Sequence, residues 1–213
     1  MRKPSQVVTG TATARDRATG SALVVPSTSM PTRKSPLPAL GSLHLRHPGF
    51  YEPLCRAYAD AAAICLSESH TSPIEIEIRR EGSSCLRELA WAEPLPDALA
   101  SWGNSHEATE QGACSVGLAT VETELGMVAL SRAETRTGAD FYVGPPGQSL
   151  ERAHRLEISG TKTGRLRDLY SRLRQKIRQT RRGLSRQPAL ACVVGFRVRM
   201  VVLTSPEMEA GDA

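Results

Sequence analysis

The sequence has few aromatic residues and no long apolar run. Aromatic residues make up only 4% of the 213 residues, so a core must be built mainly from Leu, Val, Ile and Ala. No run of about 18 apolar residues occurs, so no segment predicts a helix that spans a membrane. The first residues are basic but lack the continuous apolar stretch of a signal peptide. We therefore expect a cytoplasmic protein without membrane contact.

The cysteines are also too few and too scattered for a metal or disulfide scaffold. There are five of them, an odd number, and no two form a Cys-x-x-Cys pair. Zinc sites use closely spaced ligand pairs, and disulfide scaffolds are dense in cysteine. Small, buried core residues in a reducing compartment are the predicted role. The five are Cys55, Cys65, Cys85, Cys114 and Cys192.

Positive charge is concentrated in one segment of the chain. Residues 162–186 contain ten basic residues and one acidic residue, whereas residues 39–161 contain nine basic and 17 acidic residues. The net charge of the whole chain is +5. A local positive field on an acidic body favours contact with nucleic acid or with an acidic partner protein.

The first hundred residues predict a tail followed by a helix and a hairpin. Residues 1–40 are rich in Thr, Ser, Pro, Ala and Gly, which predicts a disordered basic tail. Within residues 41–104, apolar residues recur at helical spacing from about 50 to 67. Isoleucines then alternate with charged residues over 74–79, and a turn and a return strand complete a β-hairpin.

Residues 105–205 predict an α/β core. Its predicted elements are a helix over 105–130, strands over 138–144 and 154–160, a helix from Thr161 or Thr163 to Arg182, and one or two strands over 189–203. A polar tail, 206–213, follows. We expect an α/β fold, with α+β as the alternative, in which helices flank a central mixed sheet of about four to six strands.

Three acidic residues of this core are candidates for a site. Glu122 falls at the edge of the apolar stripe of the helix over 105–130. Asp140 and Glu157 lie on the two strands, and antiparallel pairing in a suitable register would bring them within reach of one metal ion. Ordinary roles are also open: Glu122 extending into solvent, and Asp140 pairing with Arg136 or Arg155.

The order of these elements resembles the core of the PD-(D/E)xK nuclease superfamily, the restriction-endonuclease-like fold. That resemblance implies a glutamate on the first core helix, an acid at a strand start, and an acid and a lysine two residues apart on the next strand. Glu122, Asp140 and Glu157 match the acids, while Ser159 stands where the family has lysine. Lys162, three residues further on, is the candidate replacement. The family also has a strand between the helix and Asp140, for which the predicted elements leave little room.

The resemblance implies a metal-dependent nuclease, possibly degenerate. Asp140 and Glu157 would bind Mg²⁺, and Lys162 would orient the attacking water or neutralise the phosphoryl intermediate. A non-catalytic nucleic-acid-binding subunit and an interaction protein that docks an acidic partner are the alternatives. In either nucleic-acid role, the basic helix would contact phosphates through Arg165, Arg167, Arg172, Arg174, Lys176 and Arg178.

Overall fold

The computed structural model describes residues 32–134, 137–182 and 187–205, with the side chains of residues 181 and 182 left out. Most of the tail predicted over 1–40, and the tail over 206–213, lie outside these ranges. Residues 32–40 correct the first prediction, because they are ordered. Thr32–Arg33 pair with another strand, and Leu37 and Leu40 are buried in the core.

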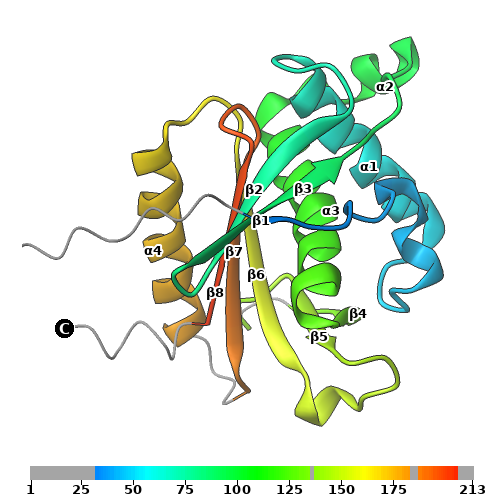
Figure 1. Ribbon diagram of the computed structural model, residues 1–213. Coiled ribbons are helices and arrows are strands. Elements are labelled where there is room, and N and C mark those ends of the chain that lie inside the picture. The colour runs from blue at the N-terminus through cyan, green and yellow to red at the C-terminus, as the bar shows by residue number, and fades with distance from the viewer. Residues whose placement is uncertain (1–31, 135–136, 183–186, 206–213) are drawn as a thin grey trace, which may run out of the picture. The chain divides into compact units, whose positions relative to one another are not determined.

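A mixed sheet forms the centre of the molecule (Figure 1). Its strand order is β1-β3-β2-β8-β7-β6-β5-β4. The α/β prediction is confirmed, although the sheet has eight strands in the described chain rather than four to six. The strands are β1 (Thr32–Arg33), β2 (Ile74–Arg80), β3 (Ser83–Leu89), β4 (Val128–Arg132), β5 (Phe141–Gly144), β6 (His154–Thr161), β7 (Ala189–Gly195) and β8 (Met200–Thr204).

The hairpin β2–β3 belongs to this sheet. The alternating isoleucines of β2 point into the core, and β2 pairs in parallel with β8 at the other end of the chain. Contacts group the described residues into one unit. The helix and hairpin expected over 41–104 as an addition to the core share its sheet.

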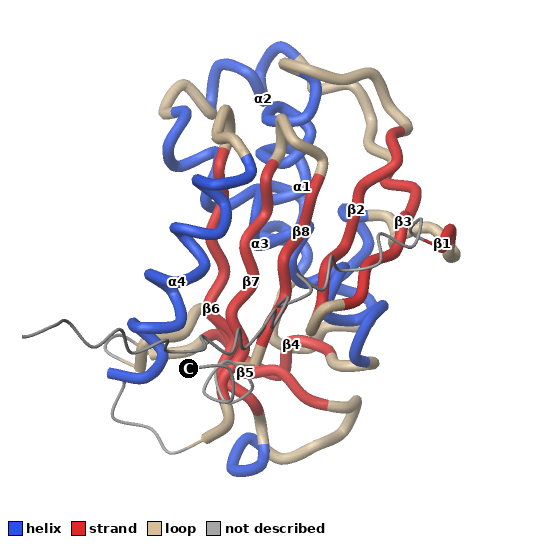
Figure 2. The backbone as a smooth tube through the Cα atoms, turned by 60° about the vertical axis from the view of Figure 1, so that its left-hand side comes forward, coloured by secondary structure: helices blue, strands red, loops and turns tan. Residues whose placement is uncertain are grey.

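Helices cover both faces of the sheet. Figures 1 and 2 show α4 on one face, with α1 and α3 on the other. The larger core lies beneath α1 and α3, and a smaller one lies beneath α4, where Leu169, Leu173 and Ile177 form the buried stripe. The helices are α1 (Glu52–Ser67), α2 (Pro96–Ser101), α3 (Ser105–Leu125) and α4 (Leu166–Arg182), with short 3-10 segments at Leu40–Leu45 and Leu150–Arg152.

Helix α3 is shorter than predicted, and a strand follows it. Gly126 adopts a left-handed φ of 65° and its N–H closes the helix on the Glu122 carbonyl. The chain then turns into β4, which pairs antiparallel with β5. The predicted helix over 105–130 therefore contained the start of a strand. Glycine tolerates this φ without strain, which explains why the helix stops there.

Tight packing around α3 explains its small residues. Gly112 lies against the backbone of Ala62 in α1, and Gly117 lies against Ile158 of β6.

All five cysteines are buried and unpaired, as predicted. Within the part of the chain that the structure describes, no helix is both long and apolar enough to cross a membrane.

Candidate active site

The site lies where β5 and β6 separate. β5 pairs with β6 only as far as Leu156, and among the described residues no strand continues that pairing along β6. Asp140, the residue before β5, lies at this fork. Its N–H donates to the Leu156 carbonyl (2.8 Å), and its Oδ2 accepts from the N–H of Ile158 (2.7 Å). The carboxylate thereby caps the free edge of β6.

Glu157 projects from β6 at the same level. Ile158 and Gly160 pack against α3, so alternation along the strand turns Glu157 toward α4. Its side chain is only 10% exposed and accepts a 2.6 Å hydrogen bond from Nζ of Lys176. The sequence predicted the direction of Glu157 but not its partner on the helix.

The environment of Asp140 favours its neutral form. Burial raises the pKa of Asp140 to about 6, and the negative charge of Glu157 adds to this rise. The hydrogen bond from Ile158 opposes the rise, and so do the positive charges of Lys176 and Arg132. They do not offset it, so a further positive charge at the fork would stabilise the Asp140 carboxylate.

A second group of side chains continues from the fork along β6. Ser159 faces α4, and its Oγ donates to the carboxylate of Glu110 on α3 at 3.1 Å. Arg172 of α4 donates to Glu110 Oε1 and to Ser159 Oγ, both at 2.8 Å. Glu110 reaches β6 because Gly160 has no side chain and lies directly against Thr109. The α3 glutamate nearest the fork is therefore Glu110.

Glu122, the glutamate predicted for the site, lies elsewhere and has a structural role. It accepts from Arg46 Nε (2.6 Å) and His47 Nε2 (2.9 Å). His47 Nδ1 accepts from the N–H of Ala129, so the ring proton on Nε2 is the one donated to Glu122. Burial works to raise the pKa of Glu122, but these two hydrogen bonds outweigh it and lower the pKa. Glu122 thus ties the segment before α1 to the end of α3.

Lys162, predicted as the catalytic lysine, is also not at the fork. Its Nζ forms an ion pair with Glu68 at the end of α1 (2.5 Å). Lys176, which the sequence assigned to phosphate binding, occupies the place beside Glu157 instead. Arg172 and Lys176 are four residues apart on α4, and Ser159 and Glu157 are two residues apart on β6. These two separations span similar distances, so Arg172 can face Ser159 while Lys176 faces Glu157.

The alternative pairing proposed for Asp140 is not observed with Arg155. That arginine is buried and donates to the carbonyls of Thr137, Thr180 and Gln187, so it anchors the end of α4. Arg136, the other proposed partner, lies outside the described residues.

The basic helix presents two different faces. Arg172 and Lys176 turn inward and bind carboxylates. Arg174 and Arg178 are exposed, and neither makes a hydrogen bond or ion pair with another described residue. Arg167 is exposed and lies 3.6 Å from the Asp168 carboxylate, and Arg165 is exposed just before the helix. Four of the six predicted phosphate contacts are therefore on the surface.

The fork suits a hard cation with few protein ligands. Across the described ranges, no group of three or more His, Cys, Asp or Glu side chains is arranged to hold a metal. A zinc site would need such a group. Mg²⁺ needs only one or two carboxylates, because it keeps several waters and also binds substrate phosphates. Asp140 and Glu157 meet that smaller requirement.

Comparisons with known proteins found no match. No protein-family model, curated protein or solved structure matches it. Its function must therefore be inferred from the side chains at the fork and the charges around them.

Proposed function

We propose that this protein is a Mg²⁺-dependent nuclease that cleaves nucleic-acid phosphodiesters at the β5–β6 fork. One observation carries the proposal: Asp140 and Glu157 lie at one strand fork, where burial and the negative charge of Glu157 raise the pKa of Asp140 and Lys176 is hydrogen-bonded to Glu157. A buried acid with a raised pKa next to a second acid is an arrangement often found at active sites.

The order of elements supports the same proposal. The resemblance to the PD-(D/E)xK superfamily called for a strand between the first core helix and the strand of Asp140, and β4 supplies it. It called for a glutamate on that helix, and Glu110 of α3 meets Ser159 of β6. It called for a lysine at position 159, and Lys176 brings an ammonium to the neighbouring acid from α4.

The position of each residue gives it a separate role in the proposed reaction. Asp140 and Glu157 would hold Mg²⁺, which when bound lowers the pKa of a coordinated water and offsets charge on the phosphate. Lys176 fixes the orientation of Glu157 and adds a positive charge beside the phosphate that is attacked. Arg172, fixed by Glu110 and Ser159, adds a second cation one helical turn away.

Cleavage of plasmid and single-stranded DNA with Mg²⁺ or Mn²⁺ tests this function. We expect cleavage by the wild type, and its loss in Asp140→Asn and Glu157→Gln. The loss should exceed the roughly 10–100-fold effect of changing a residue that only supports a metal ligand. Glu52→Gln is the matched control, because Glu52 forms an exposed ion pair on α1 and should not alter cleavage.

A non-catalytic nucleic-acid-binding subunit is the second candidate. Two observations favour it: Lys176 already binds Glu157 at 2.6 Å, and a serine stands at position 159. If the wild type binds DNA but does not cleave it under any of these conditions, the nuclease proposal is wrong and this candidate replaces it.

A further inference from the structure

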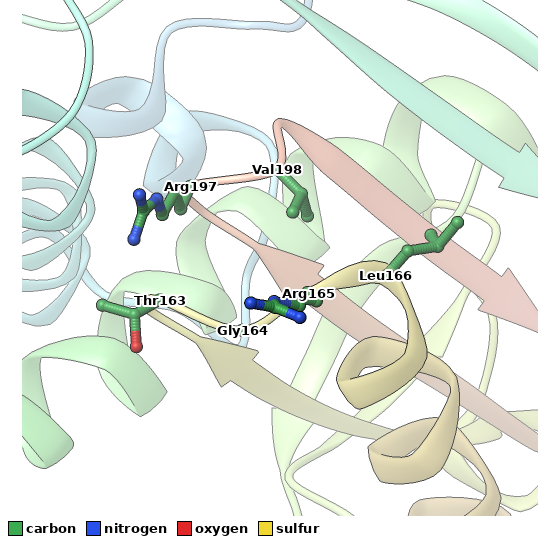
Figure 3. A pocket seen from close by; sticks show the side chains of 6 residues that line it. All are labelled: Thr163, Gly164, Arg165, Leu166, Arg197 and Val198. Carbon is green, nitrogen blue, oxygen red and sulfur yellow. The ribbon is translucent and has the colours of Figure 1, made fainter.

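A pocket of about 400 Å³ opens near the start of α4 (Figure 3). It lies between two segments far apart in sequence: the connection from β6 to α4, and the turn from β7 to β8. Its lining residues are Thr163, Gly164, Arg165, Leu166, Arg197 and Val198.

The lining carries positive charge without compensation. Arg165 and Arg197 come from the two different segments, and none of the described residues that line the pocket is acidic. Neither guanidinium makes a hydrogen bond or ion pair with another described residue. The nearby carboxylate of Asp168 is already engaged by the backbone N–H of Arg165 (2.7 Å) and by Arg167 (3.6 Å). Two unpaired guanidinium groups at one pocket suit a phosphate, which can accept from both.

The walls of the pocket are fixed by the fold. The N–H groups of Phe196 and Arg197 donate to the carbonyls of Thr161 and Lys162, which ties the two segments together. Gly195 lies so close to Val198 that a side chain there would collide with it. The two arginines are thus held on a backbone that is already in place before any ligand binds, which lowers the entropic cost of binding.

A buried hydroxyl lies behind the pocket. Thr161 Oγ1 is shielded from solvent and has no hydrogen-bond partner among the described residues. It lies against Gly164, which is part of the lining. A buried polar atom without a partner costs free energy, so a phosphate oxygen that accepted from this hydroxyl would offset that cost.

The pocket continues the row of side chains that forms the proposed active site. Glu157, Ser159 and Thr161 follow one another on the α4 face of β6, and Thr161 is about 13 Å beyond Glu157 at the usual strand rise. We propose that Arg165 and Arg197 bind a phosphate further along the nucleic-acid strand that is cleaved at the fork. This inference rests on the proposed function and adds a second anchoring point for the same substrate.

Fluorescence anisotropy of a labelled single-stranded DNA oligonucleotide tests the pocket, with the full chain in EDTA so that no cleavage occurs. We expect Arg165→Ala combined with Arg197→Ala to weaken binding about tenfold, as for the loss of charge-assisted hydrogen bonds. The slope of log K against log salt concentration should fall by about 0.7, the value for one single-strand phosphate. Arg56→Ala, which removes an exposed arginine from α1, is the control.

The single variants show whether the two arginines share one ligand. If they hold the same phosphate, each single substitution should cost most of the affinity that the double substitution costs. Additive losses would mean independent surface charges, and a double variant that binds like Arg56→Ala would mean no site at all. Either result overturns the proposal. Arg165→Gln with Arg197→Gln repeats the test should the alanine pair fail to fold.

The oligonucleotide is used with and without a 5′-phosphate. Equal losses for both forms identify a phosphate within the chain, and a loss confined to the phosphorylated form identifies a chain end. Both support a phosphate pocket.

Cleavage by the same variants separates this inference from the proposed function. If the wild type does not cleave but the double variant loses binding, the nuclease proposal fails and the pocket stands. If the wild type cleaves and the double variant binds and cleaves as well as it does, the pocket fails and the nuclease proposal stands.

Discussion

Two groups of buried acids differ in how their charge is balanced. At the C-terminal end of α3, Glu122 accepts hydrogen bonds from Arg46 and His47, and Glu124 lies beside Arg87 and Lys34. Burial works to raise the pKa of Glu124, but Arg87 and Lys34 lower it, as Arg46 and His47 do for Glu122.

At the β5–β6 fork, the balance is reversed. Asp140 has no cationic partner within hydrogen-bond distance among the described residues, and its pKa is raised to about 6. Both groups are acidic and well buried, so composition does not distinguish them. The supply of positive charge does. In the first group, which we call complete, the partners outweigh burial and lower the pKa of each acid; in the second, which we call incomplete, Lys176 and Arg132 do not offset the rise at Asp140.

Breaking the complete group should have the largest effect on stability. Arg87 is 7% exposed and binds Glu124, which is 8% exposed. Arg87→Ala leaves a buried charge with only Lys34 beside it, so the free energy of unfolding should fall by about 3 kcal/mol or more. Urea unfolding measures this. Arg56→Ala, which breaks an exposed pair, should change the value by less than about 1 kcal/mol; equal effects would show that burial of the pair is irrelevant.

Neutralising Asp140 in the incomplete group should increase stability, whereas breaking the complete group decreases it. The folded pKa of Asp140 is about 6, above the ordinary value near 4, so the folded state favours the neutral acid. Its stabilising contribution is therefore full below about pH 4 and is lost as the pH rises through about 6. Asp140→Asn keeps the neutral form at every pH.

We expect the Asn variant to be more stable than the wild type by about 2 kcal/mol at pH 8, and equally stable below pH 4. Thermal unfolding in EDTA over this pH range is the measurement. A difference that does not change with pH would mean that the pKa of Asp140 is not raised in the folded state.

Adding Mg²⁺ should stabilise the protein through the fork and not through the complete group. Mg²⁺ at ten times its dissociation constant should raise the free energy of unfolding by about 1.4 kcal/mol. Asp140→Asn and Glu157→Gln should remove this gain, while Glu124→Gln, at the complete group, should keep it. Thermal unfolding with and without MgCl₂ compares them, and a gain that survives in Glu157→Gln would place the ion elsewhere.

The smallest effect on stability is expected on the outer face of α4. Arg174 and Arg178 are exposed and unpaired in the described chain, so alanine there should change stability by less than about 0.5 kcal/mol. DNA affinity should nevertheless fall, with a salt slope reduced by about 0.7 for each lost phosphate contact. Anisotropy titrations at several salt concentrations give this slope; an unchanged slope would restrict nucleic-acid contact to the inner face.

The sequence predicted elements better than it predicted partners. Alternation identified β2 and the direction of Glu157, and a continuous apolar run identified β7, because these patterns follow from local geometry. β4 was missed because apolar residues kept helical spacing past Gly126. The glycine was the clue to the break.

The site residues required tertiary information. Glu110 and Glu122 lie on the same helix, and only the close approach of α3 to Gly160 decides which one reaches β6. Likewise, Lys162 follows the strand in sequence but turns to Glu68, whereas Lys176 comes to Glu157 from α4. The way α4 crosses the sheet determines which lysine reaches Glu157, and the spacing of residues in the sequence does not predict it.

The unpaired stretch of β6 also bears on solubility. A free strand edge offers its N–H and C=O groups to any other chain, which is a common route to aggregation. Here the Asp140 carboxylate occupies the N–H of Ile158, and the charges of Glu110 and Arg172 lie beside the same edge. The side chains of the proposed active site thus also keep other molecules from adding a strand to β6. They protect the protein from aggregation even when no substrate is bound.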